Sequence, residues 1–209
     1  KAAKQTTTAL DSAMEKLSTG KRINYARDDA AGQAISTRLT AEIQGLAMAS
    51  RNASDGQAMI DTAEGALMES QALLLRMREL AVQASNGTLA TSDRAALNTE
   101  LKSLESEITR IADTTSWAGT RLLDGSLSAG ITFQAGTMSG HTITISIPEM
   151  SASAATVSFT AAQSIGSFAS AQTAITAIDA ALSGVSEVRG KLGGVSNRFN
   201  STIANMDQV

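Results

Sequence analysis

The chain has 209 residues, of which 43% are hydrophobic and only 3% aromatic, so it can bury a sizeable core that small aliphatic side chains must fill. Its formal net charge is −3 and its seventeen lysines and arginines are spread out, which leaves no basic stripe of the kind that follows nucleic acid phosphates. The absence of cysteine excludes disulfides and cysteine-ligated zinc, and no apolar run approaches the roughly 20 residues that span a bilayer. We therefore expect no nucleic acid partner and no membrane span.

The first distinctive segment is KRINYARDDAAGQAIS, residues 21–36, in which a basic run precedes two adjacent acids and a series of small residues. Neighbouring residues on a helix point about 100° apart, so Asp28 and Asp29 do not converge as a general acid and base. Acids at a helix start commonly cap the helix and interact with its dipole. We therefore predict that a helix begins here and that the acids serve it.

A long helix is predicted next, because apolar residues recur every seven positions and keep one seam on one helix face. The residues three positions after each seam residue are mostly small, which lets a partner helix approach closely. The segment is therefore expected to be one rod of a tightly packed bundle. The seam residues are Leu39, Leu46, Ala53, Ile60, Leu67, Leu74 and Ala81.

A turn at Asn86-Gly87 is predicted to end this helix, and Ser92 or Asp93 is predicted to cap a second one. The second helix carries leucines and isoleucines at spacings of four and three. Together the two segments predict a helical hairpin with a long and a short arm. The spaced residues are Leu97, Leu101, Leu104, Ile108 and Ile111.

Residues 126–160 change character, since GITFQAGTMSGHTITISIPEM and ATVSFT alternate β-branched and polar residues around Gly-Ser turns. This pattern predicts a small antiparallel β excursion. Helical spacing returns from Phe168 to Met206. Each glycine in this segment lowers helix stability by about 1 kcal/mol, so packing must hold the segment helical. The expected fold class is mainly α: long helical rods packed as an antiparallel coiled-coil-like bundle, with a small β-hairpin region in the middle of the chain.

Catalytic and metal sites find little support in the residue pattern. The only histidine, His141, lies among alternating Thr and Ile residues without an acidic partner at ligand spacing, so we expect a solvent-facing strand residue. Neither a Gly-x-Ser-x-Gly elbow nor a Walker-type glycine loop occurs. Trp117 is predicted to cover the end of the bundle. We therefore expect no enzyme, no cofactor and no metal ion.

Five longer blocks follow one another in a distinctive order and spacing: LSTGKRINYARDDAAGQAIS, ASRNASDGQAMIDTAEGAL, RMRELAVQASNGT, EITRIADTTSWAGTRLLDG and LGGVSNRFNSTIAN. In this order they resemble the terminal core regions of bacterial flagellin. The resemblance spans roughly residues 1–125 and 165–209, and several long blocks are far more specific than one short motif. Only the middle segment, where flagellins carry variable outer domains, is unmatched.

The resemblance implies a structural subunit that assembles with other flagellin subunits into the secreted, extracellular flagellar filament, for motility. It also implies export in the unfolded state without a cleaved leader, with the flagellar export apparatus and cap as partners. The implied organisation is discontinuous. Residues 1–18 would be a remnant of the inner-tube helix, 19–33 a joint, 34–125 and 161–209 the helical core domain, and 126–160 the β excursion in place of the outer domain.

Flagellins carry further amphipathic helix at both ends, so the resemblance leads us to expect that both ends of this chain are trimmed. A trimmed chain is expected to stay monomeric at micromolar concentration, because the terminal helices add the most apolar contact area.

Two sets of residues acquire possible roles through the resemblance. The joint would use Arg22, Arg27, Asp28 and Asp29 for polar contacts within and between subunits; the alternative is a solvated loop before a helix start. Flagellins sensed by the flagellin-binding Toll-like receptor use the matching face of the long helix and the adjacent short helix. Carried over by position, this patch comprises Arg76, Leu80, Gln83 and Glu107, although Leu75 replaces a residue that is often polar.

Other interpretations of the same residues remain open. Arg76 can equally be a long side chain that extends over the short helix. A hook–filament junction protein would share the helical rods and a similar joint, although the block RELAVQASNGT favours flagellin. From a different class, a surface-displayed module would use the Thr- and Ser-rich residues 126–160 to bind a glycan or receptor.

Overall fold

The computed structural model describes residues 1–154 and 164–208. The chain forms two compact units, Lys1–Met48 and Ala49–Val209, which we call the N-terminal and the C-terminal unit. One long helix, α2 (Ala30–Ala84), contributes its first turns to the N-terminal unit and the rest to the C-terminal unit. The predicted β segment ATVSFT, residues 155–160, lies outside the described residues.

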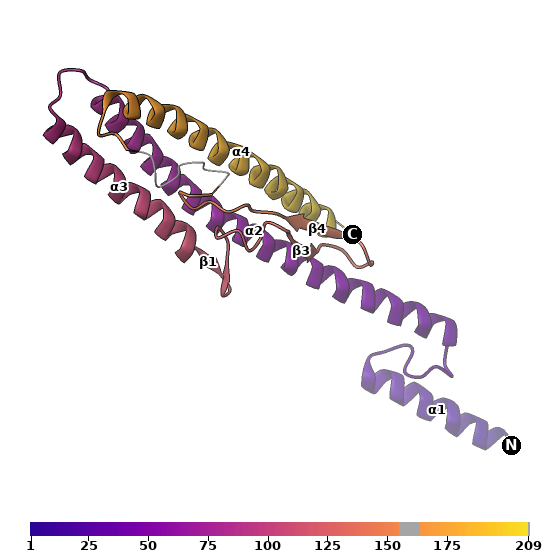
Figure 1. Ribbon diagram of the computed structural model, residues 1–209. Helices are drawn as coiled ribbons and strands as arrows, with labels where there is room; N and C mark the ends of the chain where they lie inside the picture. Colours follow the sequence, from indigo (N-terminus) through magenta and orange to yellow (C-terminus); the bar gives the residue numbers. More distant parts are fainter. Residues whose placement is uncertain (155–163, 209) are drawn as a thin grey trace. The chain divides into compact units, whose positions relative to one another are not determined.

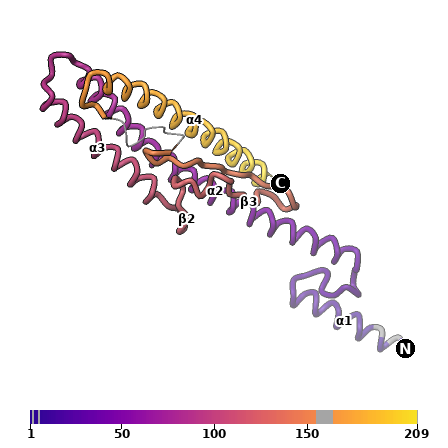
Figure 2. The backbone as a smooth tube through the Cα atoms, viewed as in Figure 1, coloured from indigo at the N-terminus to yellow at the C-terminus, as the bar shows by residue number. Residues whose placement is uncertain are grey.

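The N-terminal unit consists of α1 (Ala2–Thr19), a non-helical stretch, and the start of α2. Helix α1 ends at Thr19, and its C-cap residue is Gly20, whose φ of 66° lies in the left-handed region that glycine adopts without strain. Residues 20–29 then lead to Ala30, so α2 begins within the predicted joint (Figure 2).

Within its described part, the C-terminal unit contains three helices: α2 from Ala49 onward, α3 (Thr91–Thr114) and α4 (Phe168–Met206). In Figure 1, α3 and α4 lie alongside α2 and run antiparallel to it. The predicted mainly α fold with long, antiparallel rods is therefore confirmed. Helix α4 continues through four glycines, as expected if packing rather than propensity holds it.

The seam of α2 is buried throughout the C-terminal unit, together with the residues three positions further on. Leu39, by contrast, lies in the N-terminal unit and is largely exposed, so the predicted buried seam is wrong at its first position. Small residues at the seam allow the close helix contacts that the sequence pattern predicts. The buried residues include Ala53, Ile60, Leu67, Leu74, Ala81, Gly56, Ala63, Ser70, Met77 and Ala84.

The turn between α2 and α3 is organised differently from the prediction. Helix α3 begins at Thr91, its N-cap residue is Ala90, and no side chain caps it, so the predicted cap at Ser92 or Asp93 is wrong. The side chain of Arg94 instead donates to the carbonyl oxygens of Ala84 and Asn86, at 3.0 and 2.8 Å. These bonds satisfy carbonyl groups at the end of α2 and hold the turn from its far side.

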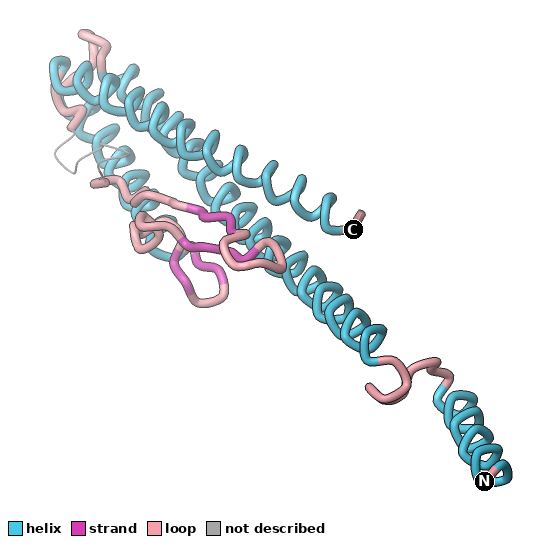
Figure 3. Tube along the Cα trace, turned by 90° about the vertical axis from the view of Figure 1, so that its right-hand side faces the viewer, coloured by secondary structure: helices cyan, strands magenta, loops and turns pink. Residues whose placement is uncertain are grey.

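The described residues in the middle of the chain form two small antiparallel sheets. Strands β3 (Ile131–Gln134) and β4 (Thr142–Ile145) pair with Ile131 opposite Ile145, which confirms the predicted hairpin region. The amide of Asn52 in α2 donates to the carbonyl of Gln134 at 3.2 Å, so the hairpin packs against α2 (Figure 3). Its buried side chains, Ile143 and Ile145, join the core.

A second, two-residue hairpin was not predicted. Strands β1 (Ser116–Trp117) and β2 (Thr120–Arg121) are joined by Ala118 and Gly119, both with positive φ. Two positive φ values in a two-residue loop are the signature of a hairpin turn, but alanine at the first position is uncommon and hides it from sequence reasoning. Trp117 packs against the core from this hairpin.

Candidate functional site

The predicted joint is held by hydrogen bonds within the N-terminal unit. The Asp28 carboxylate accepts from the backbone N–H groups of Asn24 and Tyr25, at 3.2 and 3.1 Å, and closes a turn. These donors lower the pKa of Asp28 below its ordinary value of 3.8. The carboxylate therefore stabilises the turn at neutral pH, and this contribution is lost as the pH falls through the lowered pKa.

Asp29 caps α2, as the sequence predicts for acids at a helix start. Its side-chain oxygen Oδ1 accepts from the backbone N–H of Gly32 at 2.8 Å, three residues along, as an N-cap residue does. A Cβ at Gly32 would lie 2.5 Å from Asp29 Oδ2 and 2.8 Å from Ile23 Cδ1, so a larger residue here would force the ends of these side chains to move. The two acids therefore have separate structural roles and form no catalytic pair.

The two arginines of the joint remain at its surface. The guanidinium of Arg27 lies over the ring of Tyr25, with Cζ 4.5 Å from the ring centroid, in cation–π contact. Arg22 is exposed. Both guanidinium groups thus lie on the surface of the N-terminal unit, near a turn that is fixed by Asp28 and Asp29.

Only some residues of the predicted receptor patch are exposed to solvent. Arg76 forms ion pairs with Glu100 of α3 at 2.8 Å and with Glu79 at 3.0 Å, which raise the pKa of its guanidinium. Gln83 is exposed, and Glu107 pairs with Arg110 at 2.5 Å. Arg76 therefore extends across to the short helix, as the alternative interpretation of this residue expects.

Leu80 is wrongly placed in that patch, because it is 1% exposed and belongs to the hydrophobic core. The ion pair between Arg76 and Glu100 shows that this flank of α2 faces α3. Leu80 lies one helical turn further along the same flank and is buried there. The accessible part of the patch is thus Arg76, Gln83 and the partly exposed Glu107.

Two exposed apolar stripes on the N-terminal unit were not predicted as surfaces from the sequence, which assigned Leu39 to the packed seam. On α1, Leu10, Met14 and Leu17 follow one another at spacings of four and three, and all are more than 60% exposed. On the first turns of α2, Ile35, Leu39 and Ile43 are spaced by four. Such spacing places each set on one helix face. A contiguous exposed apolar stripe is typical of a surface that another protein covers.

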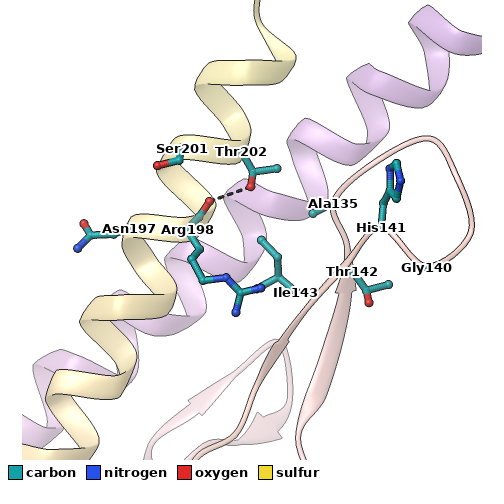
Figure 4. A pocket seen from close by; sticks show the side chains of 9 residues that line it. All are labelled: Ala135, Gly140, His141, Thr142, Ile143, Asn197, Arg198, Ser201 and Thr202. Carbon is teal, nitrogen blue, oxygen red and sulfur yellow. Dashed lines mark hydrogen bonds between the residues drawn. The ribbon is translucent and has the colours of Figure 1, made fainter.

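A groove of about 550 Å³ lies in the C-terminal unit between the β3–β4 hairpin and α4. Figure 4 shows that the side chains of Asn197 and Ser201 point away from the hairpin, whereas Arg198 of α4 points toward Ile143 and His141 lies on the loop before β4. Exposed His141 precedes β4 by one residue, close to its predicted place on a strand.

Residues 1–154 and 164–208 contain neither a metal-binding cluster nor a membrane span. Within these ranges, no group of three or more His, Cys, Asp or Glu side chains is arranged to hold a metal ion. None of the helices there is long and apolar enough to cross a membrane.

Comparison with known proteins identifies the family. A model of the bacterial flagellin N-terminal helical region matches residues 1–128. A flagellin of Halalkalibacterium halodurans is 49% identical over 197 residues, which cover 94% of this chain and 72% of the relative. Other flagellins that the chain matches are longer, and it spans 38% of flagellin A of Vibrio cholerae.

Solved structures agree with this family. The crystal structure of Bacillus cereus flagellin aligns with a TM-score of 0.65 and 32% identity, over 75% of this chain and 88% of that one. A Vibrio parahaemolyticus protein assigned as a flagellar hook-associated protein aligns with a TM-score of 0.71, over 88% of this chain and 95% of that one, but at 17% identity. That likeness extends to the fold alone. Because the family model covers more than half of the chain and the identity to a flagellin reaches 49%, the chain belongs to the bacterial flagellin family, the structural subunits of the flagellar filament.

Proposed function

We propose that this chain assembles with other flagellin subunits into the extracellular filament and acts there as a structural component rather than an enzyme. The observation that carries the proposal is the 49% identity to a flagellin over 94% of the chain. Export through the flagellar export apparatus, growth under the filament cap and a role in motility belong to the same proposal. So does the division into residues 1–18, the joint at 19–33, the helical core and the β excursion.

The two apolar stripes of the N-terminal unit support assembly. Their side chains are exposed in the single chain, and apolar area that becomes covered contributes roughly 25 cal/mol per Å². In a filament, helices of neighbouring subunits would cover these stripes. The surface guanidinium groups of Arg22 and Arg27, beside the fixed turn of the joint, would then pair with acidic groups of a neighbouring subunit.

A charge in the second stripe is expected to block assembly. Ile43 is 66% exposed, so Ile43→Glu leaves the single chain folded but places a carboxylate where a neighbour would bury apolar area. The test uses a chimera in which this chain replaces the matching region of the H. halodurans flagellin. After seeding with filament fragments, sedimentation should leave at least about ten times more Ile43→Glu than unmodified chimera in the supernatant.

The matched control is Gln44→Glu, which adds the same charge at the adjacent exposed position. We expect the control to sediment with the unmodified chimera. Equal sedimentation of both variants would mean that the Ile43 stripe is not an assembly surface, whereas failure of the unmodified chimera to sediment would count against the filament function itself.

We also propose that the monomer is recognised by the flagellin-binding Toll-like receptor through Arg76, Gln83 and Glu107. The supporting observation is the surface around Gln83: Leu75 and Val82 are exposed beside it and line the same groove of about 560 Å³. An arginine such as Arg76, close to exposed apolar side chains, is typical of binding hot spots. Leu80, being buried, is not part of this surface.

Arg76→Ala is expected to weaken binding to the receptor ectodomain at least about tenfold, because arginine anchors commonly contribute 2 kcal/mol or more. Arg198→Ala is the control: this arginine is exposed on α4 and does not line the groove beside Gln83. Surface plasmon resonance would measure both. An unmodified chain that does not bind, or equal losses in the two variants, would contradict the proposal.

A further inference from the structure

The contact between α2 and α4 is built on two seven-residue repeats. The seam of α2 repeats every seven residues, and buried residues on α4 do the same. If α4 moved along α2 by seven residues, buried positions would again face buried positions. The repeat therefore does not by itself select one alignment of the two helices. The repeating residues of α4 are Ala171, Ile178, Val185, Leu192 and Phe199.

The central polar contact does not exclude a shift of α4 toward the start of α2 either. Arg189 of α4 donates to Glu64 at 2.7 Å and also to the side-chain oxygen of Gln71. Seven residues before these partners, α2 carries Gln57 and then Glu64 again. After a shift of α4 by one repeat toward the start of α2, Arg189 would thus still meet one carboxylate and one amide. An arginine satisfied in both alignments cannot discriminate between them.

A steric feature does discriminate. The ring of Phe199, fully buried, lies against Gly56, and a Cβ at position 56 would be 2.7 Å from its Cζ atom. The positions one repeat before and after, Ala49 and Ala63, both carry a methyl group. Only one position of this series therefore leaves room for the ring. On its other side the ring meets Phe133 of β3 edge-on, with centroids 5.9 Å apart.

Gly56 leaves a space on the surface of α2, which we call the notch. We propose that this notch selects the register in which α4 docks on α2, because the ring of Phe199 fits into it. Two flanking contacts, Gln57 to Ser196 at 2.9 Å and Arg78 to Asp179 at 2.7 Å, form only in this register. The Phe133 contact extends the selection to the hairpin, which docks on the same ring. This inference concerns the single chain and is independent of filament assembly.

The absence of cysteine makes the register directly measurable by engineered crosslinks. Gln57→Cys with Ser196→Cys reports the observed register, because these side chains are in contact. Ser50→Cys with Ser196→Cys reports the register shifted by one repeat toward the start of α2. Each pair is placed in the unmodified chain and in the variant Gly56→Ala with Ala49→Gly, which moves the notch by one repeat.

In the notch-shifted variant, the yield of the shifted crosslink relative to the native one is expected to rise at least about tenfold. The control is Gly65→Ala, on the same helix, where a Cβ meets no atom within 4 Å; its crosslink ratio should not change. An unchanged ratio in the notch-shifted variant would overturn the proposal.

A second pair of variants covers loss of folding. If Gly56→Ala alone abolishes the helical circular dichroism signal, then adding Phe199→Leu, whose side chain is smaller, should restore both that signal and the native crosslink. Failure of Phe199→Leu to restore them would equally overturn the proposal, since the clash would then not involve the ring.

Discussion

Replacing Phe199 by alanine is expected to lower the free energy of unfolding by about 3–5 kcal/mol, as truncation of a buried aromatic side chain does. The ring has no exposed surface and lies between the notch at Gly56 and the edge of Phe133. Its removal leaves a cavity where α2, α4 and the hairpin meet, and rigid neighbours fill such a cavity only in part. Denaturant unfolding followed by circular dichroism measures the change.

Phe168 provides a matched control on the same helix. It is 53% exposed at the first position of α4, so Phe168→Ala should change the free energy of unfolding by no more than about 0.5 kcal/mol. Similar losses in the two variants would mean that Phe199 does not occupy the packed position described above.

Truncation of the α2 seam is expected to have the next largest effect. Leu74 is completely buried, so Leu74→Ala should cost about 2–5 kcal/mol through lost apolar burial and the cavity that remains. The adjacent Leu75 is 48% exposed and serves as the control, because Leu75→Ala removes the same atoms from an exposed position beside the seam. Chemical denaturation of both variants under one condition gives the comparison.

A loss below about 1 kcal/mol for Leu74→Ala, or an equal loss for Leu75→Ala, would mean that the seven-residue seam does not face the core. The same result would remove the basis for the register selected at Gly56, since the seam would then not be packed between α2 and α4.

The seven-residue spacing of α2 predicts its buried face well where other helices pack against that face. Ile60 and Leu67 are buried as the spacing indicates, whereas Leu39 has the same spacing and is exposed. Periodicity reports which residues share a helix face, but not whether another element covers that face. The buried and exposed parts of α2 therefore look alike in sequence and differ in structure.

The candidate receptor patch illustrates the same limit. Its spacing correctly places Leu80 on the flank that carries Arg76, but α3 covers that flank, and the sequence alone does not say which flank a neighbouring helix will take. The capping of α2 was more predictable, because Asp29 acts on a backbone group only three residues away. Hydrogen bonds between residues close in sequence are thus easier to predict than contacts between distant elements.

The notch at Gly56 was not predicted for a related reason. A glycine within a helical pattern is either simply tolerated by the helix or needed because another side chain packs closely against it. For Gly56 the position of Phe199, far along the chain, decides between these two possibilities. Gly65, on the same helix, has open space around it and shows the other outcome.

The most direct test of the filament function is electron microscopy of flagellin-deleted bacteria that express the chimera described above. If the chain is a filament subunit, the cells should carry filaments of normal diameter and swim, and peptides from this chain should be found in the sheared filaments. As a positive control, the unmodified H. halodurans flagellin should restore filaments in the same cells. If it does and the chimera is secreted but stays monomeric, the filament function is contradicted.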